Sequence, residues 1–231
     1  MKRSLLALAL VGIWAGSAAA QAPNTLTPQE VKEGWKLLFD GTTLNGWTNG
    51  GRGAEWKAQD GAILMKSDLA GNLFTEEKFD NFVLRIQFRT TPDVNSGVFI
   101  RYTPRTPPPG GYAKDGKKKG GGGGGMPGYE INIRDTEIRP VSDSKGHFDT
   151  GSIMDKIKAE DVDIVAGKWH QFEVMAQGDH ITISFDGKKI ADGNDSALKS
   201  GSIGLQWAHP ELVKGKQVEF RNIKVKPLPA T

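Results

Sequence analysis

A row of polar side chains follows one face of residues 129–134, a segment with the alternation of a β-strand. Glu130, Asn132 and Arg134 alternate there with one Tyr and two Ile, so the three polar side chains share a face. A Glu-Asn-Arg row is too polar for a core, and the face must meet either water or a ligand. Sandwich glycosidases cleave sugar bonds with two carboxylates on one strand face. Asp135 has the opposite parity to Glu130, so that pair is absent in its usual form.

A second polar row lies on residues 95–101, which precede the longest loop of the chain. Asn95 and Arg101 are six positions apart, an even difference, and the alternation places them on one face. Further polar positions occur on strand-like segments at Gln87, Arg89 and Gln206. Several polar rows on one sheet would form a concave surface of the kind that binds carbohydrates. The alternative is a solvated outer face.

Three tryptophans could either bind a sugar or belong to the core. An indole can stack on a sugar ring, but Trp in a β-sandwich is more often part of the core. The residues concerned are Trp56, Trp169 and Trp207.

Several catalytic classes are excluded by what the chain lacks. None of its 231 residues is Cys, so disulfides, thiolate metal sites and a Cys nucleophile are absent. No G-x-S-x-G motif occurs. The four His residues show no metal-ligand spacing such as H-x-x-x-H, and they are His147, His170, His180 and His209.

The first 20 residues have the pattern of a secretory signal peptide. Lys2 and Arg3 provide the positive start, an apolar run follows, and Ala18 and Ala20 occupy the A-x-A cleavage positions. We therefore expect cleavage after Ala20 and a periplasmic or secreted protein without a membrane segment. Removing Lys2 and Arg3 lowers the formal charge from +3 to +1, which leaves little support for nucleic-acid binding.

The rest of the chain predicts one β domain over residues 34–228, preceded by an exposed arm at residues 21–33. In the arm, Thr27 and Glu30 have the spacing of a helix capping box. Alternating apolar residues predict about ten strands, which favours an antiparallel sandwich or jelly roll. The expected strands lie at 62–66, 82–89, 97–102, 129–134, 171–176, 181–185, 188–190, 202–207 and 218–226. Residues 104–128 are rich in Gly and Pro and form either a surface insertion or a lid.

Several motifs together resemble the 3-keto-disaccharide hydrolase family, also described as 3-keto-α-glucoside 1,2-lyase/3-keto-2-hydroxyglucal hydratase. The chain differs from it in Met154, where the family often has Tyr, and in its long Gly-rich loop. The motifs are Gly34-Trp35-Lys36-Leu37-Leu38-Phe39-Asp40-Gly41 with Leu44-Asn45-Gly46-Trp47, Asn95-Ser96-Gly97 with Arg101, Gly128-Tyr129-Glu130-Ile131-Asn132-Ile133 with Asp135, Thr150-Gly151-Ser152-Ile153, Gly167-Lys168-Trp169-His170, Ile203-Gly204-Leu205-Gln206 and Phe220-Arg221-Asn222-Ile223.

The resemblance implies an all-β fold, a concanavalin-A-like jelly-roll sandwich of two antiparallel sheets. It also implies an exported enzyme that acts on 3-keto-glycosides. A ketone at C3 acidifies the C2 proton, so one base and one oxyanion stabiliser can replace a carboxylate pair. On this hypothesis Glu130 is the base, or the carboxylate that orients the ligand, and Arg101 stabilises the enolate.

The remaining roles follow from the same resemblance. His147 would protonate the leaving group, and Asp135 would orient it or bind a divalent metal, the one cofactor that the pattern leaves open. The substrate, a small oligosaccharide or glycoside, would be bound by Asn95, Asn132, Gln206 and Trp207. The alternatives are a non-catalytic, lectin-like binding module and a structural or adhesion sandwich.

Overall fold

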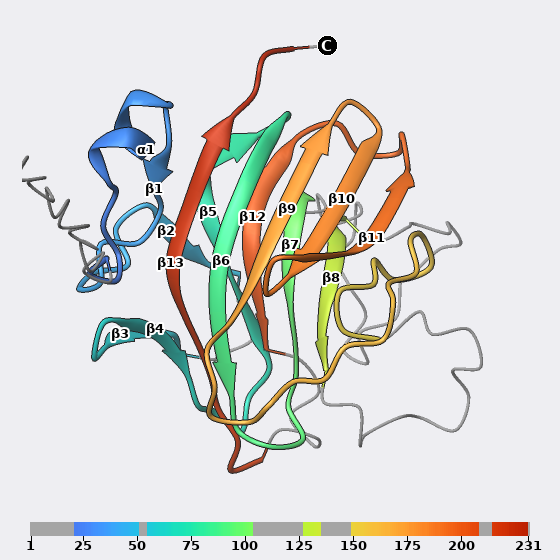
Figure 1. The fold of residues 1–231 in the computed structure, drawn as a ribbon. Coiled ribbons are helices and arrows are strands. Elements are labelled where there is room, and N and C mark those ends of the chain that lie inside the picture. The colour runs from blue at the N-terminus through green and yellow to red at the C-terminus, as the bar shows by residue number, and fades with distance from the viewer. Residues whose placement is uncertain (1–20, 51–54, 104–126, 135–148, 208–213, 231) are drawn as a thin grey trace, which may run out of the picture.

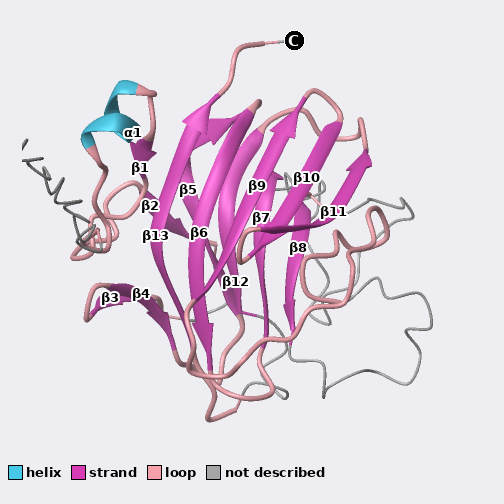
Figure 2. Cartoon of the chain, in the orientation of Figure 1, coloured by secondary structure: helices cyan, strands magenta, loops and turns pink. Residues whose placement is uncertain are grey.

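The computed structural model describes residues 21–50, 55–103, 127–134, 149–207 and 214–230. Within these residues the chain is almost entirely β-strand, with one short helix near the N-terminus (Figure 2). The strands form two antiparallel sheets that face each other across a common core (Figure 1). This is the jelly-roll sandwich that the alternating sequence pattern predicts.

The larger sheet has eight strands and lies in front in Figure 1. Its order is β11-β10-β9-β6-β13-β4-β3. The eighth strand, β1, pairs with residues 224 and 225 of β13, whereas β4 pairs with residues 218–220 of the same strand. The strands are β1 (Lys36–Leu37), β3 (Lys57–Gln59), β4 (Ala62–Met65), β6 (Phe82–Thr90), β9 (His170–Gln177), β10 (His180–Phe185), β11 (Lys188–Asn194) and β13 (Val218–Pro227). The predicted turn between β10 and β11 is confirmed, because Asp186 and Gly187 both have positive φ, at 47° and 86°.

The smaller sheet has five strands in the order β2-β5-β12-β7-β8. They are β2 (Trp47–Asn49), β5 (Gly71–Phe79), β7 (Asn95–Tyr102), β8 (Tyr129–Arg134) and β12 (Gly201–Trp207). β12 lies at the centre, between β5 and β7, and β8 is the edge strand of the path. The sequence does not predict β5, because its second half is Glu76-Glu77-Lys78 and breaks the apolar alternation.

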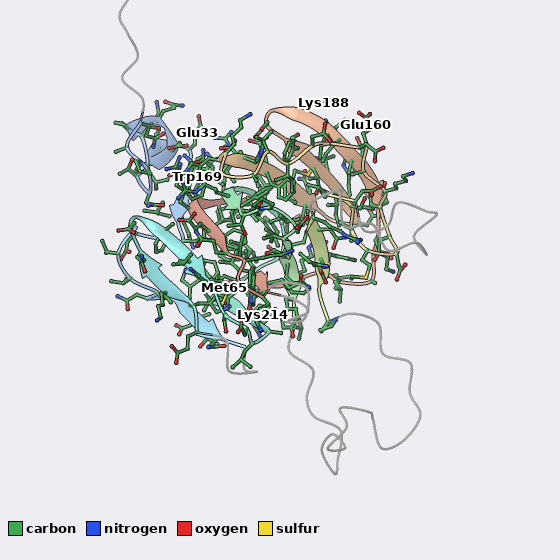
Figure 3. The ribbon with its side chains drawn as sticks, turned by 90° about the horizontal axis from the view of Figure 1, so that it is seen from below. Glu33, Met65, Glu160, Trp169, Lys188 and Lys214 are labelled. Carbon is green, nitrogen blue, oxygen red and sulfur yellow. The ribbon has the colours of Figure 1, made fainter. Side chains whose placement is uncertain are left out.

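The core fills the space between the two sheets (Figure 3). Every second residue of the long strands points into it, including Leu84, Ile86 and Phe88 from β6 and Ile131 and Ile133 from β8, all with 0% exposure. On β8, the residues that alternate with these Ile residues are Glu130, Asn132 and Arg134. The predicted shared face of these three side chains is confirmed, and it is the outer face of the five-stranded sheet.

Most residues of the N-terminal arm are exposed, as expected, but Asn24 and Glu30 are buried and anchor the arm on the sandwich. Its helix α1 (Pro28–Lys32) has the predicted capping box between Thr27 and Glu30. Asn24 donates its backbone N–H to the side chain of Asn222 on β13, and Asn222 returns a backbone hydrogen bond of 2.8 Å. Among the described residues, no helix combines the length and the apolar character needed to cross a bilayer.

Candidate active site

The outer face of the five-stranded sheet brings Glu130 and Gln206 into direct contact. Glu130 stands on β8 and Gln206 on β12, with β7 between them. The Gln206 Nε2 donates a hydrogen bond of 2.5 Å to the Glu130 Oε1. Both side chains are largely buried, with exposed fractions of 5% and 9%. Two positions that are 76 residues apart therefore form one polar group.

The contact crosses a whole strand, and a glycine makes this crossing possible. Gly97 on β7 faces Asn132 on one side and Gln206 on the other. A methyl group at Gly97 would lie 3.2 Å from the Glu130 Cγ and 3.4 Å from its Oε1. The Glu130 side chain therefore passes over the bare backbone of Gly97 to reach β12.

The surroundings of Glu130 favour its neutral form. Burial removes the carboxylate from water and raises the pKa of Glu130 to about 7, although the hydrogen bond from Gln206 acts in the opposite direction. A carboxyl with a pKa near neutrality can accept a proton and release it again at physiological pH. This property is typical of a general base or acid rather than of a structural ion pair.

A short segment at residues 150–153 supports the outer edge of the site. Residues 150–153 run along β8: Ser152 accepts the Asn132 backbone N–H at 3.0 Å, and Ile153 bridges to Ile131. The Thr150 hydroxyl accepts from the Arg134 N–H and donates to the Arg134 carbonyl. The Thr150-Gly151-Ser152-Ile153 motif thus holds the strand that carries Glu130.

Aromatic rings continue the same face beside the carboxyl. Phe99 pairs with Glu130 across the β7–β8 ladder, and its ring lies 6.1 Å from that of Phe74. Phe74 stacks on Tyr102 at 4.0 Å and covers Gly204, where a methyl group would come within 2.5 Å of the ring. Sequence reasoning missed Phe74 because it failed to predict β5. The site is consequently an acid–amide pair next to an apolar wall.

The predicted position of Arg101 is wrong. Ile100 and Arg101 together oppose the single residue Ile203, because Tyr102 pairs with Ser202 and Phe99 with Gly204. This β-bulge changes the parity of the strand, and Arg101 has a φ of 52°. Its guanidinium is fully buried and donates to three backbone carbonyls, at Asp80, Gly178 and Leu198. Arg101 therefore anchors turns, and Arg134 is the arginine on the Glu130 face.

The expectation that Trp207 binds substrate is also not met by its position. Trp207 is 1% exposed, belongs to the core and donates its indole N–H to the Ser67 carbonyl. Trp56 is likewise in the core. Trp169 directly precedes β9 of the other sheet, and the guanidinium groups of Arg89 and Arg221 lie 4.7 and 4.0 Å from its ring.

The polar rows expected on one sheet are in fact divided between two. Gln87 and Arg89 lie on β6 in the eight-stranded sheet, whereas Asn95, Asn132 and Gln206 lie with Glu130 in the five-stranded sheet. Asn95 pairs with Arg134 at the end of β7. The candidate site therefore keeps Glu130, Asn132, Gln206 and Asn95 from the sequence prediction.

Two predicted residues, Asp135 and His147, lie outside the described residues. Among the described residues, no group of three or more His, Cys, Asp or Glu is placed to hold a metal ion. His170, the buried histidine on β9, receives the Val165 N–H and contacts Asp186 at 2.8 Å. It therefore has a structural environment on the sheet opposite Glu130.

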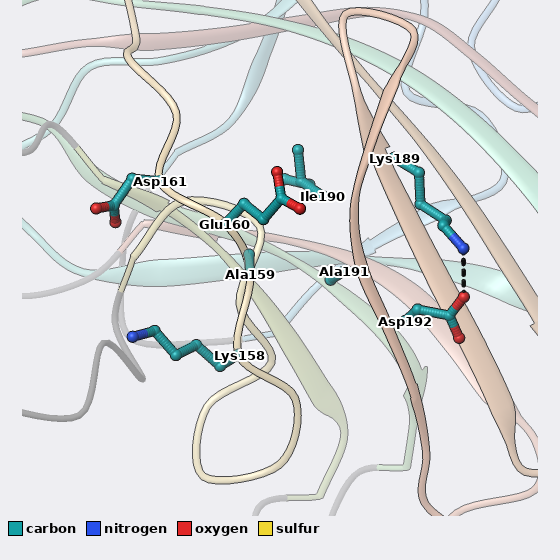
Figure 4. A pocket seen from close by; sticks show the side chains of 8 residues that line it. All are labelled: Lys158, Ala159, Glu160, Asp161, Lys189, Ile190, Ala191 and Asp192. Atoms are coloured by element: carbon teal, nitrogen blue, oxygen red, sulfur yellow. Dashed lines mark hydrogen bonds and ion pairs between the residues drawn. The ribbon is translucent and has the colours of Figure 1, made fainter.

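A separate pocket of about 450 Å³ lies between residues 158–161 and β11 (Figure 4). Two ion pairs involve its charged side chains: Lys189 binds Asp192 at 2.5 Å, and Glu160 binds the neighbouring Lys188 at 2.7 Å (Figures 3 and 4). These pairs are exposed to water, where ion pairs contribute little. The five charged side chains of its lining are exposed to water, whereas the Glu130 carboxyl is buried and has no charged hydrogen-bond partner among the described residues, so we place the chemistry at Glu130.

The fold and this site define a jelly-roll protein with a buried carboxyl on one sheet. Residues 34–226 match the family described as the 3-keto-alpha-glucoside-1,2-lyase-like domain. The chain belongs to this family, as its motifs suggest.

One curated protein matches part of the sequence, and its name agrees with the family. A 3-keto-disaccharide hydrolase of Bacteroides thetaiotaomicron is 31% identical over 92 residues, which is 35% of this chain and 31% of that protein. The aligned part is thus about a third of the length of this curated relative.

Among solved structures, a candidate glycosyl hydrolase of Parabacteroides distasonis aligns with a TM-score of 0.70 and 21% identity, over 90% of this chain and all of that one. The carbohydrate binding module CBM66 of Bacillus subtilis aligns with a TM-score of 0.51 and 18% identity, over 78% and 94% of the two chains. At these identities the likeness shows a common fold.

Proposed function

We propose that the protein is an enzyme that cleaves 3-keto-glycosides, among them 3-keto-disaccharides. Family membership and the name of the Bacteroides relative support this substrate class. The observation that carries the proposal is the environment of Glu130, a buried carboxyl that is bonded to a neutral amide and has a pKa of about 7. A reaction that needs one base, rather than two carboxylates, fits this arrangement.

The proposed reaction begins with transfer of the C2 proton to Glu130. The ketone at C3 accepts the electron pair as an enolate, and the C1–O bond then breaks, so that the aglycone leaves with its electron pair and takes up a proton. Water adds to the resulting enone, and the net change is hydrolysis. A general base of this kind contributes about 10²–10⁴-fold to the rate.

The groups beside Glu130 have roles that fit the charge that develops. Asn132 and Arg134 lie on the same face of β8 as Glu130, and Arg134 takes the role first assigned to Arg101. Amide and guanidinium donors fixed near an enolate oxygen stabilise it because they need no reorganisation. Asn95, opposite Arg134, is available for a sugar hydroxyl.

The test is Glu130→Gln, assayed on a 3-keto-glucoside and on the parent glucoside. We expect the variant to fold and to lose about 10²-fold or more of its activity on the keto substrate. The matched control is Glu173→Gln, because Glu173 pairs with Arg85 on the outer face of the opposite sheet and should be dispensable for activity. Wild-type activity of a folded Glu130→Gln protein would refute the assignment.

The second candidate function is carbohydrate binding without catalysis. It is favoured by the fold shared with CBM66 and by the polar row on the five-stranded sheet. The same assay separates the two functions: binding of the keto sugar without release of product would support the binding module.

We further propose that the protein is exported and cleaved after Ala20. The support is the arrangement of Lys2, Arg3, the apolar run and the small residues that precede Gln21. Cell fractionation and mass spectrometry of the purified protein test this. An intact Met1 in protein from the bacterial cytoplasm would contradict it.

A further inference from the structure

The Gln206 amide has one satisfied end and one unsatisfied end. Its Nε2 donates to Glu130, whereas its Oε1 is buried and has no hydrogen-bond partner among the residues that the structure describes. Buried acceptors without a donor are rare in folded proteins and call for an explanation at each position. Gly97, the neighbour across the β12–β7 ladder, has no side chain that could supply a donor.

A half-buried glutamine on the other sheet shows the usual arrangement. The Oε1 of Gln87, on β6, accepts from the Arg221 Nε at 3.0 Å and from the Asn222 Nδ2 at 2.9 Å. The described part of the chain therefore supplies two donors to the Oε1 of Gln87 and none to that of Gln206. The unsatisfied acceptor is the one that lies next to the proposed base.

The donor that is missing from the protein can come from a substrate. In a 3-keto-glucoside, C2 carries both the proton that the base removes and a hydroxyl group. Because both groups are attached to one carbon, they reach two acceptors that are close together. A hydrogen bond of 2.5 Å joins the Glu130 carboxyl and the Gln206 amide, so these two acceptors are close enough to contact both groups on C2.

We propose that the Gln206 Oε1 accepts a hydrogen bond from the C2 hydroxyl while Glu130 removes the proton from the same carbon. This inference rests on the proposed function and narrows its substrate class to 3-keto-glycosides with a free 2-hydroxyl. A 2-deoxy analogue still has C2 protons and can eliminate by the same bond changes. It would leave the buried acceptor unsatisfied, which a site built around a hydroxyl strongly disfavours.

The test compares kcat/KM for a 3-keto-glucoside and its 2-deoxy analogue. We expect the wild-type protein to prefer the hydroxylated substrate by about 10²-fold or more. In Gln206→Met, which has a similar length but no acceptor, this preference should fall to within a few-fold. Gln87→Met is the matched control and should keep the preference, since Gln87 lies on the other sheet.

The outcomes separate this inference from the proposed function. If the wild-type protein turns over neither substrate, the proposed function is wrong and the inference falls with it. If the wild-type protein turns over both equally well, or Gln206→Met keeps the preference, only the inference is overturned. The wild-type comparison is decisive even if Gln206→Met does not fold, and circular dichroism shows whether it does.

Discussion

Two buried glutamates of this protein have opposite acid–base properties. Glu30 in the N-terminal helix and Glu130 in the five-stranded sheet are 9% and 5% exposed. Burial alone would raise both pKa values. At Glu30, hydrogen bonds from Lys224 and Thr27 outweigh burial and lower the pKa to about 2, whereas Glu130 has only the Gln206 amide and a pKa of about 7.

The difference shows what each glutamate can do. The Lys224 ammonium binds the Glu30 carboxylate directly, and Arg85 lies 3.7 Å from it, so Glu30 remains charged and links the arm to β13 and β6. Glu130 has a neutral partner and can change its protonation state near pH 7. The Glu130 carboxyl is also more deeply buried than that of Glu30, so the charge of the partner and the depth of burial together separate the structural carboxyl from the reactive one.

The largest effect on stability is expected for Glu30→Gln. The substitution leaves Lys224 buried without its counter-ion and weakens the capping box, which should lower the free energy of unfolding by on the order of 3 kcal/mol. Urea denaturation at pH 7 measures the loss. Activity per folded molecule should stay at the wild-type level, because Glu30 packs on the other sheet. A stable but inactive Glu30→Gln protein would contradict the structural role of Glu30.

The two glutamates should also respond to pH in opposite ranges. The pKa of Glu130 is raised, so its contribution to stability is complete below about pH 4.5 and is lost as pH rises through about 7. The pKa of Glu30 is lowered, so its contribution is present above about pH 4.5 and is lost as pH falls towards about 2.

Denaturation of the wild-type protein, Glu130→Gln and Glu30→Gln at several pH values tests these ranges. The wild-type protein should lose stability relative to Glu130→Gln between about pH 4.5 and 7. Relative to Glu30→Gln, its advantage should shrink only in acid. A constant difference from Glu130→Gln across pH 5–8 would mean that the Glu130 pKa is not raised.

Strand periodicity predicts much of the fold and part of the site. The alternation in residues 129–134 is unbroken, so the face of Glu130 and the core positions opposite it follow directly. The same argument places Gln206 on an outer face and Leu205 in the core. A regular strand has a period of two, and an uninterrupted ladder preserves it.

The predictions fail where local geometry or distant contacts decide the outcome. One extra residue in β7 turns Arg101 away from the site, and the sequence around it contains no signal for this bulge. Trp207 is in the core because its own parity matches that of Ile203 and Leu205, although its type suggests sugar stacking. The Glu30–Lys224 contact joins residues 194 positions apart, so no local pattern indicates it.

The smallest effects on stability and activity are expected for Gly97→Ala, which tests the position of the Glu130 side chain. Gly97→Ala introduces a methyl group 3.2 Å from the Glu130 Cγ and 3.1 Å from the Ile131 carbonyl, which should displace the carboxyl from Gln206. We expect a loss of about 1 kcal/mol in stability and on the order of tenfold in kcat/KM, since small displacements of a catalytic group are costly.

Gly193→Ala on β11 is the matched control for this substitution. Its methyl group would lie 3.0–3.2 Å from the side chain of Ile157, which is similarly tight but is connected to β8 only indirectly, through Ile153. It should cost a similar amount of stability and leave kcat/KM unchanged. If both variants lose activity equally, general loosening of the sandwich explains the loss. If only Gly97→Ala does, the bare backbone of β7 is what allows Glu130 to reach Gln206.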